Sequence, residues 1–226
     1  MNHFPVVSKS DSQLAVSSSL KPAPYWLLAG FWICTMIAIA VVIRRLVALE
    51  HPSVSGPPQM AALDNAFSSH TALTVAHIVP ALAFVLLAPF ALLRRFAALR
   101  WPKKLLYPLG IVVGATAYAM STYAVGGWTE RSAVFFFDTL FLYSLVRAWL
   151  FQSRNQDALS RLWLIRAVAV LLGIATTRPI MGIFFATSRL TQLSFQQFFG
   201  IAFWVGFSIN WIVVEAWFRA ANQRVA

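Results

Sequence analysis

Apolar residues fill this chain in six long runs, separated by short polar segments. Each run has the roughly 20 residues that an α-helix needs to cross a hydrocarbon core of about 30 Å. Because a helix satisfies its backbone hydrogen bonds within one segment, we expect every run to be a transmembrane helix. The chain is therefore predicted to be an all-α, polytopic membrane bundle. Its six helices are expected at about 25–48, 70–93, 105–128, 132–151, 162–187 and 192–216.

The segments outside these runs are polar. Residues 1–23 are rich in serine, so we predict a disordered cytoplasmic tail ahead of one transmembrane domain, 24–220. The longest loop, about 49–69, is rich in proline, serine and glycine. Two interpretations of this loop stay open, because it could be a solvated connector or a cap over the outer face of the bundle.

Composition supports the membrane assignment. The chain has 226 residues, of which 59% are hydrophobic and 11% are charged, against roughly 25% charged residues in a soluble domain. The formal net charge of +11 would also suit nucleic acid. The basic residues, however, stand at the ends of apolar runs, where they set membrane topology. We therefore expect the lipid bilayer as partner and no nucleic acid.

The basic residues alternate between the two sides of the predicted bundle. Twelve lie in the tails, in the loop 94–104 and near the turn 147–161, whereas the opposite loops carry only Arg131 and Arg189. Cytoplasmic loops of membrane proteins carry an excess of lysine and arginine. This distribution predicts cytoplasmic termini, in a multi-pass protein of the bacterial inner membrane.

Polar residues inside the runs fall into two layers of depth. A charged side chain in hydrocarbon is costly, and it persists where it faces the protein interior, water or a partner. Five helices contribute to the outer layer, which is the predicted ligand pocket: Arg44, Arg45, His77, Asp138, Arg178 and Gln196. The inner layer holds Arg147, Arg166, Asn210 and Glu215.

The outer layer contains three arginines and one embedded carboxylate, Asp138. Uncompensated positive charge in a low-dielectric pocket favours an anion, such as a carboxylate, a phosphate, a lipid head group or a haem propionate. The alternative is structural, because buried polar residues also join membrane helices. Under either interpretation, we expect Asp138 to be coupled to at least one outer arginine.

Several chemistries lack a signature in the sequence. The single cysteine, Cys34, excludes an intramolecular disulfide. Local motifs of zinc proteases, serine hydrolases and P-loop proteins are absent, so we predict no catalytic or metal-binding residues. His70 and His77 are separated by about 10.5 Å along one helix, at about 1.5 Å per residue, and cannot clamp one haem iron from opposite sides. The cofactor stays unknown, with haem or quinone as alternatives.

One set of motifs resembles a known family. Trp163-Leu-Ile-Arg166, followed after eleven residues by Arg178, resembles the W-M-I-R…R signature of a bacterial multi-helix membrane family catalogued as a domain of unknown function. His77-Ile78, Gly126-Gly127 and Asn210-x4-Glu215 resemble further signatures of that family, and Arg44 or Arg45 resembles an arginine that ends its first helix. The likeness covers roughly 40–220, and it implies a fold and polar positions without an activity.

This chain departs from the resembled family at two places. Arg100 and Ser160 stand near positions where that family often has histidine, which implies that any metal or haem capacity of those histidines is lost here. We expect a binding protein for an anionic small molecule or lipid head group, in a sensing or transport-accessory role. The alternatives are a redox protein holding haem or quinone, and a structural subunit of a membrane complex. Protein partners are not indicated.

Overall fold

The computed structural model describes residues 23–50, 58–96 and 101–222, and these residues form helices and no strand. Most of the predicted tail lies outside the described residues, as does Arg100. The helices are α2 (Tyr25–Glu50), α3 (Pro58–Ser68), α4 (Thr71–Leu92), the 3-10 turn η1 (Arg94–Phe96), α5 (Trp101–Ser121), α6 (Gly127–Ser153), α7 (Asp157–Leu171), α8 (Gly173–Thr191) and α9 (Phe195–Asn222).

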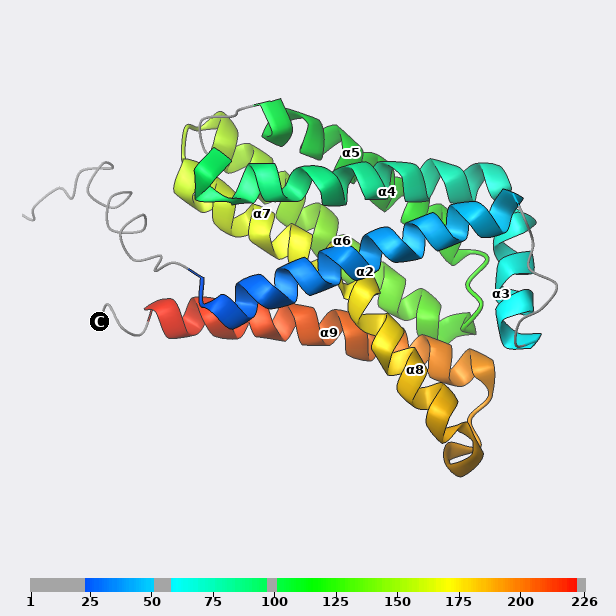
Figure 1. Ribbon diagram of the computed structural model, residues 1–226. Coiled ribbons are helices and arrows are strands. Elements are labelled where there is room, and N and C mark those ends of the chain that lie inside the picture. Colours follow the sequence, from blue (N-terminus) through cyan, green and yellow to red (C-terminus); the bar gives the residue numbers. More distant parts are fainter. Residues whose placement is uncertain (1–22, 51–57, 97–100, 223–226) are drawn as a thin grey trace, which may run out of the picture.

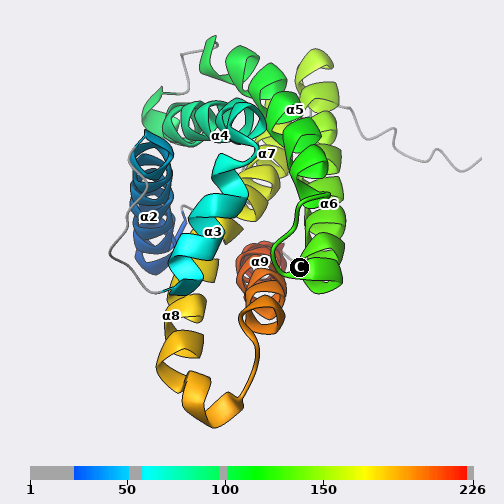
Figure 2. The same cartoon turned by 90° about the vertical axis from the view of Figure 1, so that its right-hand side faces the viewer.

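Most of the long helices run along one common direction, with α7 at the centre of the bundle (Figures 1 and 2). Leu164 and Ala167 of α7 are fully buried, which fits this central position. Five helical segments are long and apolar enough to cross a membrane: Tyr25–Glu50, Thr71–Leu92, Gly127–Ser153, Asp157–Thr187 and Phe195–Ala221. The fold class is therefore all-α, in the form of a multi-pass membrane protein.

The predicted loop 49–69 contains a helix, α3, and this helix crosses the end of the bundle opposite the described termini (Figure 2). Leu63 of α3 is only 1% exposed and packs in a cluster with Met181, Phe199 and Ala202. The buried side of α3 is therefore part of the core, so α3 is a cap and not a solvated connector.

The third run begins and ends earlier than predicted, whereas the fourth begins earlier and ends slightly later. α5 ends at Ser121, and α6 begins at Gly127. The turn between them depends on Gly127, whose φ of +62° lies in the left-handed region that glycine adopts without a steric penalty. The prediction counted apolar residues only, and it therefore extended the third helix through this turn to residue 128.

The fifth run is two helices, because the chain bends between α7 and α8 (Figure 1). At the bend, the Leu172 N–H donates to the Val168 carbonyl at 2.9 Å, and the Ala175 N–H donates to the Leu172 carbonyl at 3.0 Å. The second bond spans only three residues and tightens the chain locally. Gly173 lies at the bend against Phe207 of α9, where an added Cβ would lie 2.6 Å from the ring.

The start of α9 packs directly on the start of α6. A Cβ added to Gly200 would lie 2.8 Å from the backbone nitrogen of Glu130, and one added to Gly126 would lie 2.8 Å from the nitrogen of Gly200. Two backbones can approach this closely only where both residues lack side chains. The approach brings the aromatic face of α9 toward Glu130.

We predict that Gly200→Ala destabilises the bundle by about 1–3 kcal/mol, since the new methyl group meets backbone atoms that cannot rotate away. The measurement is the melting temperature of the purified protein in detergent. Gly182→Ala in α8 is the matched control, because nothing lies within 4 Å of a Cβ at that position. Equal melting temperatures for the two variants would contradict the close approach.

Candidate functional site

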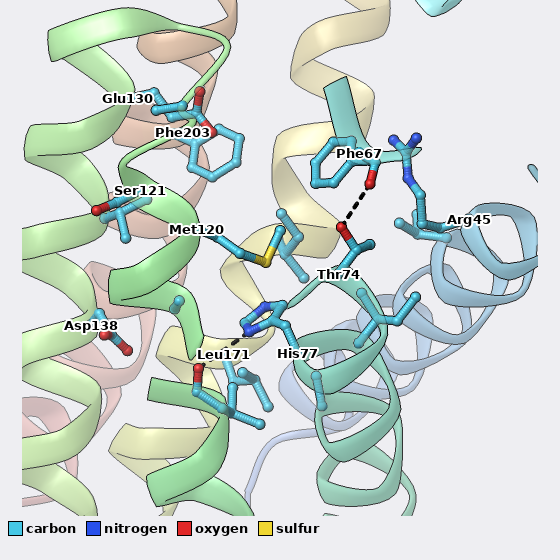
Figure 3. Close-up of a pocket in the computed structure, with 18 of the residues that line it drawn as sticks. Arg45, Phe67, Thr74, His77, Met120, Ser121, Glu130, Asp138, Leu171 and Phe203 are labelled. Carbon is cyan, nitrogen blue, oxygen red and sulfur yellow. Dashed lines mark hydrogen bonds between the residues drawn. The ribbon is translucent and has the colours of Figure 1, made fainter. Parts of the chain in front are cut away.

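A cavity of about 240 Å³ lies inside the bundle, bounded at one end by α3 (Figure 3). All eight described α-helices contribute side chains to its wall. Most of the lining is apolar, as is usual for sites that bind small molecules. The polar lining residues are Arg45, His70, Thr74, His77, Ser121, Tyr123, Glu130, Asp138 and Arg178.

Four of the six predicted pocket residues line this one cavity, namely Arg45, His77, Asp138 and Arg178. The other two do not. Arg44 has a half-exposed side chain outside the cavity wall. Gln196 is exposed in the first turn of α9, whose cavity face begins only at Phe199.

Arg45 forms a buried ion pair with Asp64 of α3. Its Nη1 lies 2.5 Å from Asp64 Oδ1, and the two side chains are only 8% and 7% exposed. The guanidinium also lies 4.0 Å from the centre of the Phe67 ring, a cation–π geometry. Arg44 adds a longer contact, 3.3 Å from its Nη2 to Asp64 Oδ2. We call the contact between Arg45 and Asp64 the α2–α3 ion pair.

The predicted coupling between Asp138 and an outer arginine is wrong, because the acid that pairs with an outer arginine is Asp64. Asp138 forms no ion pair in the described part of the chain, and its Oδ2 atom is buried without a hydrogen-bond partner. Asp64 takes that role because α3 folds over the bundle and carries an acid from the predicted loop into the interior.

Arg178 is the outer arginine that lacks an ion pair. Its Nε is buried without a partner, and its Nη1 has only the weak acceptor Met181 Sδ at 3.9 Å. Glu130 is near enough to interact with Arg178 electrostatically. The Glu130 carboxylate, however, accepts the Gly126 N–H at 2.6 Å at the start of α6. The guanidinium of Arg178 therefore faces the cavity with donors available.

His77 is oriented by α5. Its Nδ1 lies 3.2 Å from the Val113 carbonyl oxygen and 2.9 Å from Thr116 Oγ1. A carbonyl oxygen only accepts, so Nδ1 carries the hydrogen and donates it. In the neutral ring, Nε2 is then an acceptor. Among the described residues, no group donates a hydrogen bond to this Nε2.

His70 lines the same cavity in a different environment. Its ring lies on that of Tyr123, with 3.6 Å between the centroids, and its Nδ1 lies 3.0 Å from Ser69 Oγ. Three or more histidine, cysteine, aspartate or glutamate side chains do not come together in a metal-binding group within the described ranges. The wall of the cavity thus offers isolated hydrogen-bonding groups among apolar side chains.

The predicted inner layer lies outside this cavity and joins helices. Arg166 forms a two-point contact with Glu215, at 2.5 Å from Nε to Oε1 and 3.2 Å from Nη2 to Oε2. This contact connects α7 to α9. Asn210 accepts a hydrogen bond from Thr176 and donates one to the Ala169 carbonyl. Arg147 lies 5.0 Å from the centre of the Trp163 ring.

The sequence did not single out Glu130 as a cavity residue. It stands near the end of an apolar run, where a solvated acid is the ordinary expectation. One local signal was available, because Glu130 follows Gly126 by four residues at a helix start. An acid in the first turn of a helix can accept a hydrogen bond from the backbone before that helix.

No protein-family model, no curated protein and no solved structure matches this chain. The resemblance to a family of unknown function stays a prediction.

The α2–α3 ion pair gives a stability prediction. Asp64→Asn leaves the Arg45 guanidinium buried beside a neutral amide, and losing one partner of such a pair typically costs about 3–5 kcal/mol. A double-mutant cycle with Arg45→Met and Asp64→Leu, measured by thermal unfolding in detergent, should be strongly non-additive.

The matched control is the cycle of Arg178→Gln with Asp138→Asn, the pair expected from the sequence. It should be additive to within about 0.5 kcal/mol, as for sites without direct contact. The assignment of Asp64 fails if the first cycle is additive and the control cycle is not.

Proposed function

We propose that the protein binds an anionic small molecule or lipid head group through Arg178, with the apolar part of the ligand in the cavity. The observation that carries the proposal is the Arg178 guanidinium, which lines the cavity and forms no ion pair with a described carboxylate. A guanidinium matches carboxylate and phosphate groups through two parallel hydrogen bonds.

The pattern of contacts made by the outer arginines supports this proposal more than their net charge balance does. The structure brings two acids that were not predicted, Asp64 and Glu130, near the three outer arginines. Asp64, however, lies against Arg44 and Arg45, and Glu130 bonds to the backbone of Gly126. Arg178 therefore keeps free donors although two acids lie near the outer arginines.

The apolar wall gives the proposed ligand a second attribute. Phe137, Phe141, Leu171 and Phe203 are among the lining side chains, and they would remove an apolar group from water. An anionic group joined to an apolar body satisfies both parts of the site. A lipid and a free small amphiphile share this chemistry, and mass spectrometry of the extracted ligand distinguishes them.

Binding without chemistry fits a sensing or transport-accessory role. A structural subunit is the competing proposal, and the contacts between Arg45 and Asp64 and between Arg166 and Glu215 favour it because they join helices. A redox role with haem or quinone is a third proposal, and no contact in the described residues favours it over binding.

We also propose that α5 is a sixth membrane span and that both termini are cytoplasmic, in a bacterial inner membrane. α5 has 21 residues and lies beside α4 and α6. The described termini and the first turns of α5 and α7 lie at one end of the bundle (Figure 1). Lys103 in the first turn of α5 is 3.9 Å from Asp157 in the first turn of α7, which joins two of these basic segments.

The topology proposal predicts the outcome of reporter fusions. Alkaline phosphatase fused after residue 57 or 129 should be active, because both positions would be periplasmic. Fusions after residue 99, residue 156 and the C-terminus should be inactive, while a cytoplasmic reporter shows the opposite pattern. An active phosphatase at 99 would contradict both the sixth span and the orientation.

The ligand proposal predicts the effect of Arg178 substitutions. Organic extracts of the purified wild-type protein should contain an anionic amphiphile, detected by untargeted mass spectrometry. Its occupancy should fall about tenfold or more in Arg178→Gln, a loss of about 1.4 kcal/mol or more in binding. Arg178→Lys should fold but hold less ligand, since an ammonium lacks the planar fork.

Arg44→Gln is the matched control, because Arg44 belongs to the same layer but lies outside the cavity wall. It should retain the ligand. Equal ligand in wild type and Arg178→Gln, or a wild-type protein without an anionic ligand, would overturn the proposal and favour the structural role.

A further inference from the structure

The polar residues of the cavity form two groups of opposite hydrogen-bonding character. The first group surrounds Arg178, which interacts electrostatically with Arg44, Arg45 and Glu130. The second group consists of His77 on α4 and Asp138 on α6. In Figure 3, Arg45 and Glu130 lie toward the α3 end of the cavity, and His77 and Asp138 lie farther from it.

The two groups are separated along α6. Asp138 follows Glu130 by eight residues, which corresponds to about 12 Å at about 1.5 Å per residue. Asp138 forms no ion pair with a described residue, whereas Arg44 and Arg45 both contact Asp64. Asp138 is thus outside the charge network that surrounds the arginines.

The deeper group offers hydrogen-bond acceptors to a ligand. The His77 hydrogen is already donated from Nδ1 toward Val113 and Thr116, which leaves Nε2 as an acceptor. Asp138 is 8% exposed and lines the cavity, and its Oδ2 has no hydrogen-bond partner. A buried carboxylate without a partner is costly, so a group that donates to it contributes strongly to binding.

From this arrangement we infer that the ligand is polar at both ends, with an anionic group at Arg178 and a hydroxyl or ammonium group that donates to Asp138, while His77 offers a further acceptor on the same cavity wall. The part of the ligand between its two polar ends is apolar, because the cavity wall between the two groups of residues is apolar. This inference rests on the proposed function and specifies the class of its ligand. It also places Asp138, which forms no ion pair within the bundle, in a ligand-binding role.

The test uses defined probes with the full-length protein in lipid nanodiscs. Octanoate is compared with its ω-hydroxy and ω-amino derivatives and with an ω-methoxy analogue of equal heavy-atom count, and the hexanoate series covers a shorter span. The methoxy oxygen accepts but cannot donate. We expect the ω-hydroxy or ω-amino probe to bind about tenfold more tightly than octanoate and the methoxy probe, the size of a hydrogen bond to a charged group.

This preference should disappear in Asp138→Leu, which removes the acceptor at similar volume, and should decrease in His77→Phe. Two variants are used so that poor folding of one leaves the test intact. Ser121→Ala is the control, because Ser121 lines the cavity but donates its hydroxyl to the Tyr118 carbonyl of its own helix at 2.7 Å. This variant should keep the preference.

The outcomes separate the two proposals. If all probes in both series bind the wild type equally and Arg178→Gln abolishes their binding, the anion site stands and the inference about the second polar end is wrong. If the preference persists in both Asp138→Leu and His77→Phe, the inference is also wrong. If Arg178→Gln binds every probe like the wild type, the proposed function fails, and the inference fails with it.

Discussion

The contact between Arg45 and Asp64 organises the end of the bundle that α3 crosses. It fastens α3 to α2, while the Thr74 hydroxyl donates to the Phe67 carbonyl at 3.0 Å and fastens α3 to α4. With α3 held at two points, a bundle that would otherwise be open at this end encloses a cavity. A buried ion pair is weak evidence for net stability, but breaking it leaves an uncompensated charge. The closed end therefore depends on both partners being present.

Much of the fold follows from the sequence, because lipid permits few structures. Apolar runs longer than a membrane crossing must become helices, so the long helices and their order were predictable. The α3 helix was not, because 11 residues with polar neighbours carry no strong periodic signal. The bend at Leu172 was missed for a related reason. Hydropathy records how apolar a segment is, whereas a bend depends on a glycine that fits against a neighbouring helix.

The candidate site was predicted in part. The predicted depth in the membrane assigned Arg45, His77, Asp138 and Arg178 to one layer. The structure places all four on the wall of one cavity. Depth alone does not fix which way a side chain points, so Arg44 and Gln196 were included although they lie outside the wall. Pairing was harder to predict, because it depends on segments folding back. Asp64 reaches Arg45 only through α3, and Glu130 reaches the cavity only through the close approach of α6 and α9.

The bend between α7 and α8 changes what the spacing of two arginines means. Arg166 and Arg178 are twelve residues apart, and one straight helix would fix the angle between them at 3.6 residues per turn. The bend places them on separate helices with different axes. Arg166 is held to α9 by Glu215, while Arg178 lies on the helix that turns away from α7. A helical wheel drawn through this segment as one straight helix therefore does not give the relative directions of Arg166 and Arg178, and directions in α8 are counted from Gly173.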